Sequence, residues 1–201
     1  YYPVDMTISF YIKEFSSDLI LTVNNAAYGS DLIAVASLNA NATGIVRFNA
    51  GNITEDVNIV DGKAVWKFKG LDVGEYNITA NYLGNVYYVE SSNQTSFVVT
   101  KANSTIELYV KEVTLGENIR IYANLSPNAT GSVSFSMIGY FSPRDKPIVN
   151  STSSWYIAPL NTGEYEVIAK YAGDKNYYAS NTTYILRINQ HKTVMDVELN
   201  D

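Results

Sequence analysis

The chain of 201 residues contains no cysteine, a single histidine and only five prolines. Without cysteine it forms no disulfide bonds, and it has neither thiolate metal ligands nor a thiol nucleophile. It also lacks an apolar run of the roughly 18 or more residues that a membrane-spanning helix requires. Basic residues number 14 against 20 acidic ones, which gives a net charge of −6 without any basic cluster. That balance argues against nucleic acid as a partner.

Constellations of catalytic residues are missing as well. The one histidine, His191, has no acid or nucleophile near it in the sequence, and a solitary surface histidine is the better interpretation. Carboxylates are scattered along the chain, and no glycine-rich phosphate loop occurs. The stretch 173–176 (Gly-Asp-Lys-Asn) offers too few oxygen ligands for calcium and is predicted to be a turn. We therefore expect no enzymatic activity, no metal site and no cofactor.

What the sequence does contain is an internal repeat. Residues 71–84 and residues 160–173 share the pattern Leu-x-x-Gly-Glu-Tyr followed by Ala-x-Tyr-x-Gly, with a spacing of 89 residues (160 minus 71). Trp66 and Trp155 obey the same spacing. Self-similarity at a fixed period indicates tandem copies of one structural unit.

Upstream the spacing between the copies changes by two residues. The run Asn-Ala-Thr-Gly at 41–44 returns at 128–131, which is 87 positions later. The second copy must therefore contain a two-residue insertion, which we place in the stretch 139–147. This stretch holds two of the five prolines and the charged pair Arg144 and Asp145. We expect an irregular loop there, either a contact site or, as the better interpretation, an ordinary variation in length.

The repeated motif has the form of a tyrosine corner. In each copy a glycine is followed two residues later by a tyrosine, Tyr76 or Tyr165, and then by alternating apolar residues. In immunoglobulin-like sandwiches this tyrosine hydroxyl bonds to the backbone of the preceding turn. The position two residues further on, a disulfide cysteine in antibody domains, is Ile78 in one copy and Val167 in the other. The motif thus resembles that of cysteine-free, prokaryotic-type Ig-like repeats.

Alternation of apolar and polar residues predicts strands along the whole chain and no helix. We expect an all-β fold with two tandem immunoglobulin-like β-sandwich domains, residues 15–101 and 102–201, preceded by an N-terminal donor strand in residues 1–14. Asp61-Gly62 predicts a two-residue hairpin. The predicted strands of the two sandwiches are 19–23, 31–39, 44–49, 56–60, 64–68, 75–82, 95–100, 105–110, 117–125, 131–138, 153–157, 164–171 and 183–188.

The first residues form an amphipathic strand that belongs to neither copy. Residues 4–13 alternate strictly, so that one face is apolar and the other carries Thr7, Ser9, Tyr11 and Lys13. Its apolar face, the expected donor-strand interface, consists of Met6, Ile8, Phe10 and Ile12.

Both ends of the chain align with the middle of the repeat. At a spacing of 87, Phe10 falls on Phe97 and Ile12 on Val99, in the last strand of the first copy. Residues 192–200 similarly align with the first strand of the second copy. The first residue is tyrosine, which either a removed signal peptide or an arbitrary boundary explains.

Acceptor triplets for N-glycosylation, Asn-x-Ser/Thr, are frequent. Given 21 asparagines and 33 serines and threonines, chance predicts about three triplets, and nine occur. A polar β surface rich in these residues is the alternative, but so large an excess favours a secreted, densely glycosylated protein. The triplet of Asn124 is followed by Pro127, which makes it the least favourable acceptor. The nine acceptors are Asn41, Asn52, Asn77, Asn93, Asn103, Asn124, Asn128, Asn150 and Asn181.

Taken together, the amphipathic tail, the two sandwiches, the absence of cysteine and the many acceptor triplets resemble subunits of archaeal surface filaments called threads. The resemblance covers the whole chain in architecture and composition. It implies an extracellular pilus subunit that polymerises head to tail by donor-strand complementation and supports adhesion or biofilm formation. Its partners would be identical subunits and covalent N-glycans. Some such filaments also carry intersubunit isopeptide bonds, for which Lys13 is one candidate amine.

The residues themselves point the same way. A strand that exposes four large apolar side chains and an unpaired edge is avoided in free proteins, and adding it to another molecule's sheet covers both. Such a head-to-tail contact need not close, so an open filament follows. Two other interpretations remain open, a segment of a long adhesin stalk and a carbohydrate-binding surface module. Exposed tyrosines can stack on sugars, although alternating tyrosines are more often part of the sheet.

Overall fold

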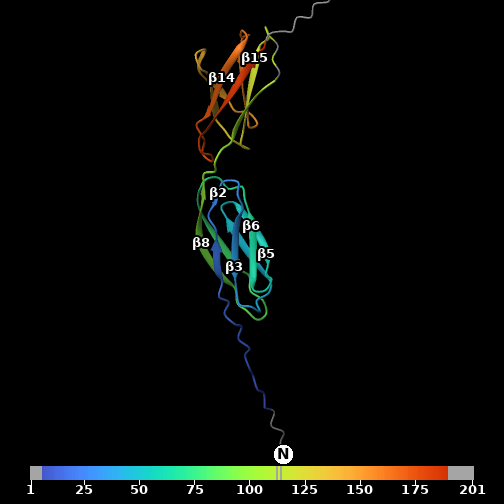
Figure 1. The fold of residues 1–201 in the computed structure, drawn as a ribbon. Coiled ribbons are helices and arrows are strands. Elements are labelled where there is room, and N and C mark those ends of the chain that lie inside the picture. Colours follow the sequence, from blue (N-terminus) through green and yellow to red (C-terminus); the bar gives the residue numbers. More distant parts are fainter. Residues whose placement is uncertain (1–5, 112, 114, 190–201) are drawn as a thin grey trace, which may run out of the picture. The chain divides into compact units, whose positions relative to one another are not determined.

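The structure is a computed structural model, and it describes residues 6–111, 113 and 115–189 (Figure 1). All regular elements among these residues are β-strands. The chain divides into two compact units, Tyr1–Thr100 and Lys101–Asp201, called unit 1 and unit 2 below. Each unit is an immunoglobulin-like β-sandwich, as the sequence predicts. Among the described residues no helix has the length and hydropathy of a membrane span.

Unit 1 contains a three-stranded sheet with the order β1-β3-β6 and a five-stranded sheet with the order β2-β8-β7-β4-β5. All neighbours are antiparallel except β2, which runs parallel to β8. The strands of unit 1 are β1 (Ile20–Val23), β2 (Ala26–Ala27), β3 (Leu32–Ser37), β4 (Ile45–Ala50), β5 (Ile53–Asn58), β6 (Lys63–Phe68), β7 (Gly74–Tyr82) and β8 (Ser91–Thr100).

Unit 2 repeats this arrangement with two sheets of the order β13-β10-β9 and β12-β11-β14-β15. All of these strand pairs are antiparallel. The strands of unit 2 are β9 (Ile106–Val110), β10 (Ile119–Leu125), β11 (Ser132–Met137), β12 (Phe141–Pro147), β13 (Thr152–Ile157), β14 (Gly163–Tyr171) and β15 (Ser180–Ile188).

The two tryptophans occupy equivalent places in the two cores. Trp66 on β6 is 6% exposed and lies 5.7 Å from the ring of Phe48 on β4. Trp155 on β13 is 5% exposed and lies 6.0 Å from the ring of Phe135 on β11. Both pairs join the two sheets of their sandwich, because each partner strand belongs to the other sheet. The alignment of the two copies therefore holds in three dimensions.

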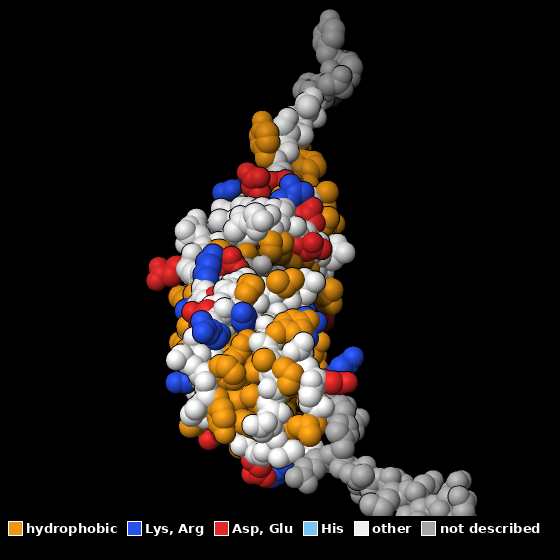
Figure 2. Space-filling model, turned by 90° about the horizontal axis from the view of Figure 1, so that it is seen from above, with side chains coloured by type: hydrophobic (Ala, Val, Ile, Leu, Met, Phe, Trp, Pro, Cys, Tyr) orange, Lys and Arg blue, Asp and Glu red, His pale blue; other side chains and the backbone are white. Residues whose placement is uncertain are grey.

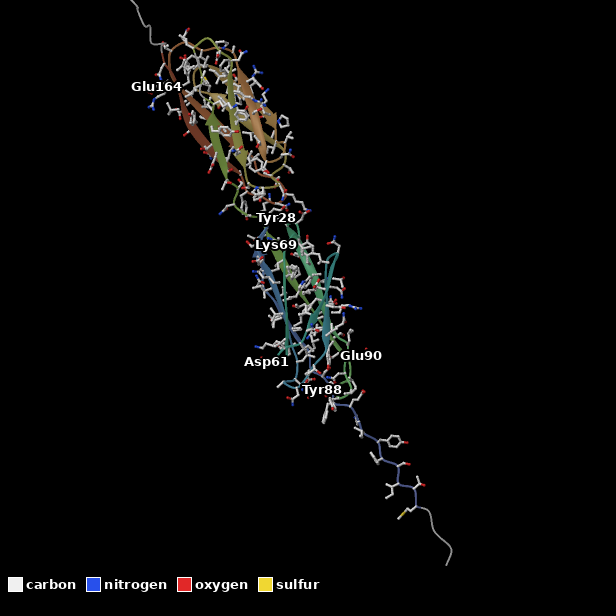
Figure 3. The ribbon with its side chains drawn as sticks, turned by 90° about the vertical axis from the view of Figure 1, so that its right-hand side faces the viewer. Tyr28, Asp61, Lys69, Tyr88, Glu90 and Glu164 are labelled. Carbon is white, nitrogen blue, oxygen red and sulfur yellow. The ribbon has the colours of Figure 1, made fainter. Side chains whose placement is uncertain are left out.

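The hairpin predicted at Asp61-Gly62 is confirmed. Val60 pairs with Lys63 across these two residues, whose φ angles are 49° and 71°. Two consecutive positive φ angles are typical of the type I′ turn, whose twist matches that of the flanking strands. Figure 3 shows Asp61 at one end of unit 1.

Two predictions about edge strands are wrong. The stretch 139–147 is not an irregular loop, because most of it forms β12, which pairs with β11. Proline and charged residues misled the prediction, but they are tolerated on an edge strand, where one side of the backbone needs no partner. The strand predicted at 56–60 is instead β5, at Ile53–Asn58. The sequence also missed β2, a strand of only two residues.

Candidate functional site: an exposed amino-terminal strand

The described tail, residues 6–14, has no strand partner, and its apolar face is open to solvent. Met6 is 82% exposed, Ile8 76%, Phe10 81% and Ile12 88%. Hydrophobic side chains stand out from this extended segment next to the atoms drawn in grey (Figure 2). Residues 1–5 of the predicted donor strand lie outside the described residues.

The tail is anchored to unit 1 just after its apolar face ends. Phe15 forms a parallel bridge with Tyr88, through backbone bonds of 2.7 Å from Phe15 N to Tyr87 O and 3.0 Å from Val89 N to Phe15 O. Two residues later the hydroxyl of Ser17 donates to Val89 O at 2.8 Å. Figure 3 shows Tyr88 at the end of unit 1 from which the tail extends. The anchor fixes where the tail leaves the sandwich.

The same anchor recurs at the entrance to unit 2, 87 residues later. Ala102 forms a parallel bridge with Tyr177, and the hydroxyl of Ser104 donates to Tyr178 O at 2.7 Å. In that copy the chain just before the anchor is β8, the last strand of unit 1. By this equivalence residues 6–13 correspond to residues 93–100, most of the last strand β8, in agreement with the alignment of Phe10 with Phe97.

Both units nevertheless already possess a last strand of their own. β8 pairs with β7 over nine residues, from Gly74↔Val99 to Tyr82↔Ser91. β15 pairs with β14 in the same way, from Gly163↔Ile188 to Tyr171↔Ser180. In the described structure the tail therefore finds no vacant last-strand position in a second copy, and it can be accommodated by addition to a sheet edge.

The sheet edges differ in how well they are protected against such addition. β5 carries Glu55 and Asp56, and β12 carries Pro143 and Pro147, which are residues that discourage further pairing. β15 contains neither proline nor acidic residues and a single basic one, Arg187. Among the described strands β15 pairs only with β14, whereas its counterpart β8 pairs with both β7 and β2. The outer edge of β15 is thus a candidate acceptor.

The two predicted tyrosine corners have the expected geometry. The hydroxyl of Tyr76 donates to the carbonyl of Asp72 at 2.9 Å, and that of Tyr165 donates to the carbonyl of Asn161, also at 2.9 Å. Each bond spans four residues and ties the start of β7 or β14 to the turn before it. The two tyrosines thus have a structural role within their sandwiches and lie apart from the exposed tail.

All nine predicted acceptor asparagines are exposed. Their places in the fold differ. Asn77 lies on β7 and Asn124 on β10, with their side chains on outward faces, whereas Asn150 occupies the turn before β13 with a φ of 50°. The amide nitrogen of Asn93, the atom that a glycan would join, donates to Leu19 O at 2.9 Å.

The stretch 173–176 forms the turn that the sequence predicts. One carboxylate oxygen of Asp174 accepts from the backbone of Asn176 and Tyr177, at 2.8 Å each. The other accepts from the backbone N–H and the hydroxyl of Thr130, at 2.9 and 2.8 Å. Partial burial opposes ionisation, but these hydrogen bonds prevail and lower the pKa of Asp174 from 3.8 to about 2. Two of these contacts close the turn itself, and the two from Thr130 tie the turn to the loop before β11, as expected of a structural turn.

The remaining candidates form no cluster. Within residues 6–111, 113 and 115–189 no group of three or more potential metal ligands occurs. Lys13 is exposed on the tail, and Arg144 and Asp145 are exposed on β12. His191 and the strand predicted at 192–200 lie outside the described residues.

No protein-family model matches the chain, and no curated protein matches it. Solved structures with similar folds include a two-domain fibronectin type III segment of chicken tenascin, 17% identical over 85% of this chain and 99% of that one, with a TM-score of 0.46. Fibronectin(III)-like modules of CbhA from Clostridium thermocellum are 17% identical over 88% and 100%, with a TM-score of 0.34. A 1.5-MDa bacterial ice-binding adhesin is 13% identical over 88% and 66%, with a TM-score of 0.35. The fold assignment rests on strand order and on the two tyrosine corners.

Proposed function

We propose that the chain is the structural subunit of an extracellular filament, in which the tail of one copy adds as a strand to a sheet of the next. The observation that carries this proposal is the apolar face of residues 6–12, which is more than three-quarters exposed at all four positions. Burying one such side chain stabilises a contact by about 1.5–3 kcal/mol. A strand with this face and an unpaired backbone has reason to pair with another molecule.

The acceptor we propose is unit 2 of a second copy, at the outer edge of β15. Support comes from the absence of protecting proline and acidic residues on β15 and from its single described neighbour. The tail belongs to unit 1 and β15 to unit 2. Each copy can therefore donate its tail to one neighbour and accept the tail of another neighbour on β15. Such a heterologous contact leaves a free tail and a free edge at the two ends of any assembly, and growth is open-ended.

The proposal places the protein outside the cell as a glycoprotein that supports adhesion or biofilm formation, without enzymatic activity, cofactor or nucleic-acid partner. Nine exposed acceptor asparagines support glycosylation, and a cysteine-free sandwich needs no oxidising compartment to fold. The role in adhesion or biofilm formation follows from the likeness to thread subunits.

A second candidate is a stretch of a cell-surface adhesin stalk, in which such sandwiches follow one another in a single long chain. It is favoured by one observation, the identical anchors at Phe15 and Ala102. These anchors are what a covalently continuous array would show at every joint. The two candidates differ in whether residues 6–13 pair within one chain or between chains.

A paired substitution on the tail separates these candidates. Phe10→Asp places a charge on the apolar face, whereas Tyr11→Asp places the same charge on the opposite face of the same strand, where the side chain is 98% exposed. We expect Phe10→Asp to abolish filaments seen by electron microscopy, since a buried unpaired carboxylate is costly, and Tyr11→Asp to leave filaments intact. Both variants should unfold as the unmodified protein does, because neither residue contacts a sandwich.

Filaments that persist in Phe10→Asp, or in a chain lacking residues 1–13, would refute donor-strand assembly and favour the stalk. Loss of filaments in both Asp variants alike would show that charge, and not burial of the apolar face, governs assembly.

A further inference from the structure

An apolar turn lies at the end of unit 1 from which the tail extends, called the entry end below. The turn, residues 83–88, connects β7 and β8, carries no charge, and is bonded to the anchored residue Phe15. Figure 3 shows its last residue, Tyr88, at this end. Four large apolar side chains, called the entry patch, are at least half exposed there: Phe15 (67%), Leu83 (51%), Val86 (79%) and Tyr87 (66%).

The sandwich fold does not require apolar side chains at this end. The corresponding turn of unit 2 contains the charged residues Asp174 and Lys175. It lies where unit 1 precedes unit 2 in the chain, whereas the entry patch lies beside the exposed tail. The equivalents of the entry patch in unit 2 are Ala102, Ala172, Lys175 and Asn176.

A second apolar turn lies at the opposite end of unit 2, where β15 ends, called the exit end. β11 runs in the same direction as β15, because each is antiparallel to β14, so the turn after β11 lies at this end. The ring of Tyr140 in this turn lies 4.8 Å from that of Tyr165, at the start of β14. In unit 1 the turn between β4 and β5 consists of Gly51 and Asn52 alone. The exposed side chains of the turn in unit 2, called the exit patch, are Ile138 (56%), Tyr140 (60%) and Phe141 (36%).

The tail is too short to keep these two ends apart once it is bound. A tail that adds beside β15 in the direction of a last strand places Ile12 next to its equivalent Ile188, where β15 ends. Only Lys13 and Glu14 separate Ile12 from the anchored Phe15, and three residues of extended chain span about 10 Å. The entry end of one copy must then lie against the exit end of the copy that receives its tail.

We propose that the entry patch packs against the exit patch of the copy that receives the tail, so that each joint consists of a shared strand and a contact between two turns. This inference rests on the proposed function and adds the second half of the same joint. Neither turn carries a charge, so the contact itself brings no like charges together. Because the bound tail already holds the two copies, a few side chains contribute without forming a stable interface by themselves.

The predicted glycosylation sites leave the exit patch uncovered. In unit 1, by contrast, Asn52 lies in the turn that corresponds to it. The entry end of unit 1 carries a triplet at Asn41, but the same loop carries Asn128 in unit 2, so a site there is common to both units. All five acceptors of unit 2 lie at or near its entry end: Asn103, Asn124, Asn128, Asn150 and Asn181.

Pairs of introduced cysteines test the contact, because the chain has no cysteine of its own. Val86→Cys with Ile138→Cys places one thiol in each patch. The control, Val86→Cys with Val149→Cys, places the second thiol at a side chain of similar exposure (65%) at the entry end of unit 2. Filaments are oxidised, dissolved in denaturant and separated by non-reducing gel electrophoresis. We expect covalent trimers and longer chains from the first pair, roughly tenfold more than from the second.

A ladder beyond dimers requires a head-to-tail contact, because each single-cysteine variant can form dimers at most. Filaments of the first pair that yield nothing longer than dimers would overturn the inference. An equal or longer ladder from the control pair would also overturn it, because the tail would then run in the opposite direction along β15.

A charge at either end of unit 2 measures what the contact contributes. Ile138→Asp and Val149→Asp alter exposed side chains, so both variants should keep their fold. We expect Ile138→Asp to raise the lowest protein concentration that gives filaments roughly tenfold, and Val149→Asp to leave it unchanged. Equal values for both variants would speak against the exit patch. An unmodified chain without filaments would refute the proposed function, whereas filaments without these effects would refute the contact alone.

Discussion

The two units close the same turn with different chemistry, an amide in unit 1 and a carboxylate in unit 2. In unit 1 the side-chain oxygen of Asn85 accepts from the backbone of Tyr88 at 2.9 Å, and its nitrogen donates to the carbonyl and hydroxyl oxygens of Thr43 at 3.3 and 3.0 Å. In unit 2 Asp174 replaces the amide and can only accept. Thr130, the counterpart of Thr43, accordingly turns its N–H and its hydroxyl toward it.

This exchange has a consequence for a buried tyrosine. In unit 1 the hydroxyl of Tyr82 donates to the carbonyl of Thr43 at 3.0 Å. Its counterpart Tyr171 is buried, and its hydroxyl has no hydrogen bond of good geometry within the described part of unit 2. Burial raises the pKa of Tyr171 far above its ordinary value. The comparison shows that one backbone fold tolerates opposite donor and acceptor patterns when the facing loop reorients with them.

The largest expected difference between the units concerns the glycine that begins this turn. A Cβ at Gly173, whose φ is 84°, would lie 2.6 Å from the carbonyl oxygen of Tyr177, whereas a Cβ at Gly84, with a φ of 75°, would lie 3.0 Å from that of Tyr88. We expect Gly173→Ala to lower the free energy of unfolding of unit 2 by about 3 kcal/mol, and Gly84→Ala to lower that of unit 1 by about 1–2 kcal/mol.

Tryptophan fluorescence during denaturant unfolding measures both effects, because Trp66 reports on unit 1 and Trp155 on unit 2. Replacing the other tryptophan with phenylalanine isolates each signal. Gly116→Ala is the control for backbone strain without a clash, since its φ is 88° and no atom lies within 4 Å of the added Cβ. Equal losses at Gly84 and Gly173 would show that the close approach in unit 2 has no energetic weight.

A smaller difference should appear on acidification. The pKa of Asp174 is about 2 in the folded unit, below the ordinary 3.8. Because the folded pKa is the lower one, its contribution is complete above about pH 4 and is lost as the pH falls toward 2. By linkage it amounts to about 2 kcal/mol. The Trp155 signal should show this loss in the unmodified chain.

Asp174→Asn removes that pH-dependent contribution, so the variant should show a correspondingly smaller loss of unit 2 stability between pH 5 and pH 2. At neutral pH the variant should also be less stable. If the new amide oxygen accepts from Asn176 and Tyr177, the amide nitrogen faces the N–H of Thr130, and two donors then oppose each other. A variant whose stability falls with pH as steeply as that of the unmodified chain would contradict the role assigned to this carboxylate.

Sequence alone predicted most of the fold, since strands with an inward apolar face and a repeated corner motif are set by local patterns. Trp66, Trp155 and both corner tyrosines lie where the repeat placed them. The exceptions are edges. β12 contains prolines and charges that usually mark loops, and β2 has two residues, too few for any periodicity. Pairing at an edge depends on which strand lies beside it, which local composition does not encode.

The candidate site was foreseen as an amphipathic strand, because residues 6–12 alternate as clearly as any strand of the sandwiches. Its anchor was not foreseen. The bridge of Phe15 to Tyr88 has no local signal, although the spacing of 87 to Ala102 would have located it once the pairing of either residue was known. The last strand of each unit was predicted, at 95–100 and 183–188, although both strands begin earlier in the structure, at Ser91 and Ser180.

The central claim is that the tail becomes a hydrogen-bonded strand in another copy, and amide hydrogen exchange tests it most directly. Exchange at residues 6–13 is compared between assembled filaments and the unassembled Phe10→Asp chain, with β7 as an internal reference. The account predicts rapid exchange of the tail amides in the unassembled chain. In filaments the exchange should slow roughly a hundredfold or more at the tail amides that bond to the neighbouring strand, which are every second one when the tail pairs on one side. Tail amides that exchange equally fast in both states would contradict it.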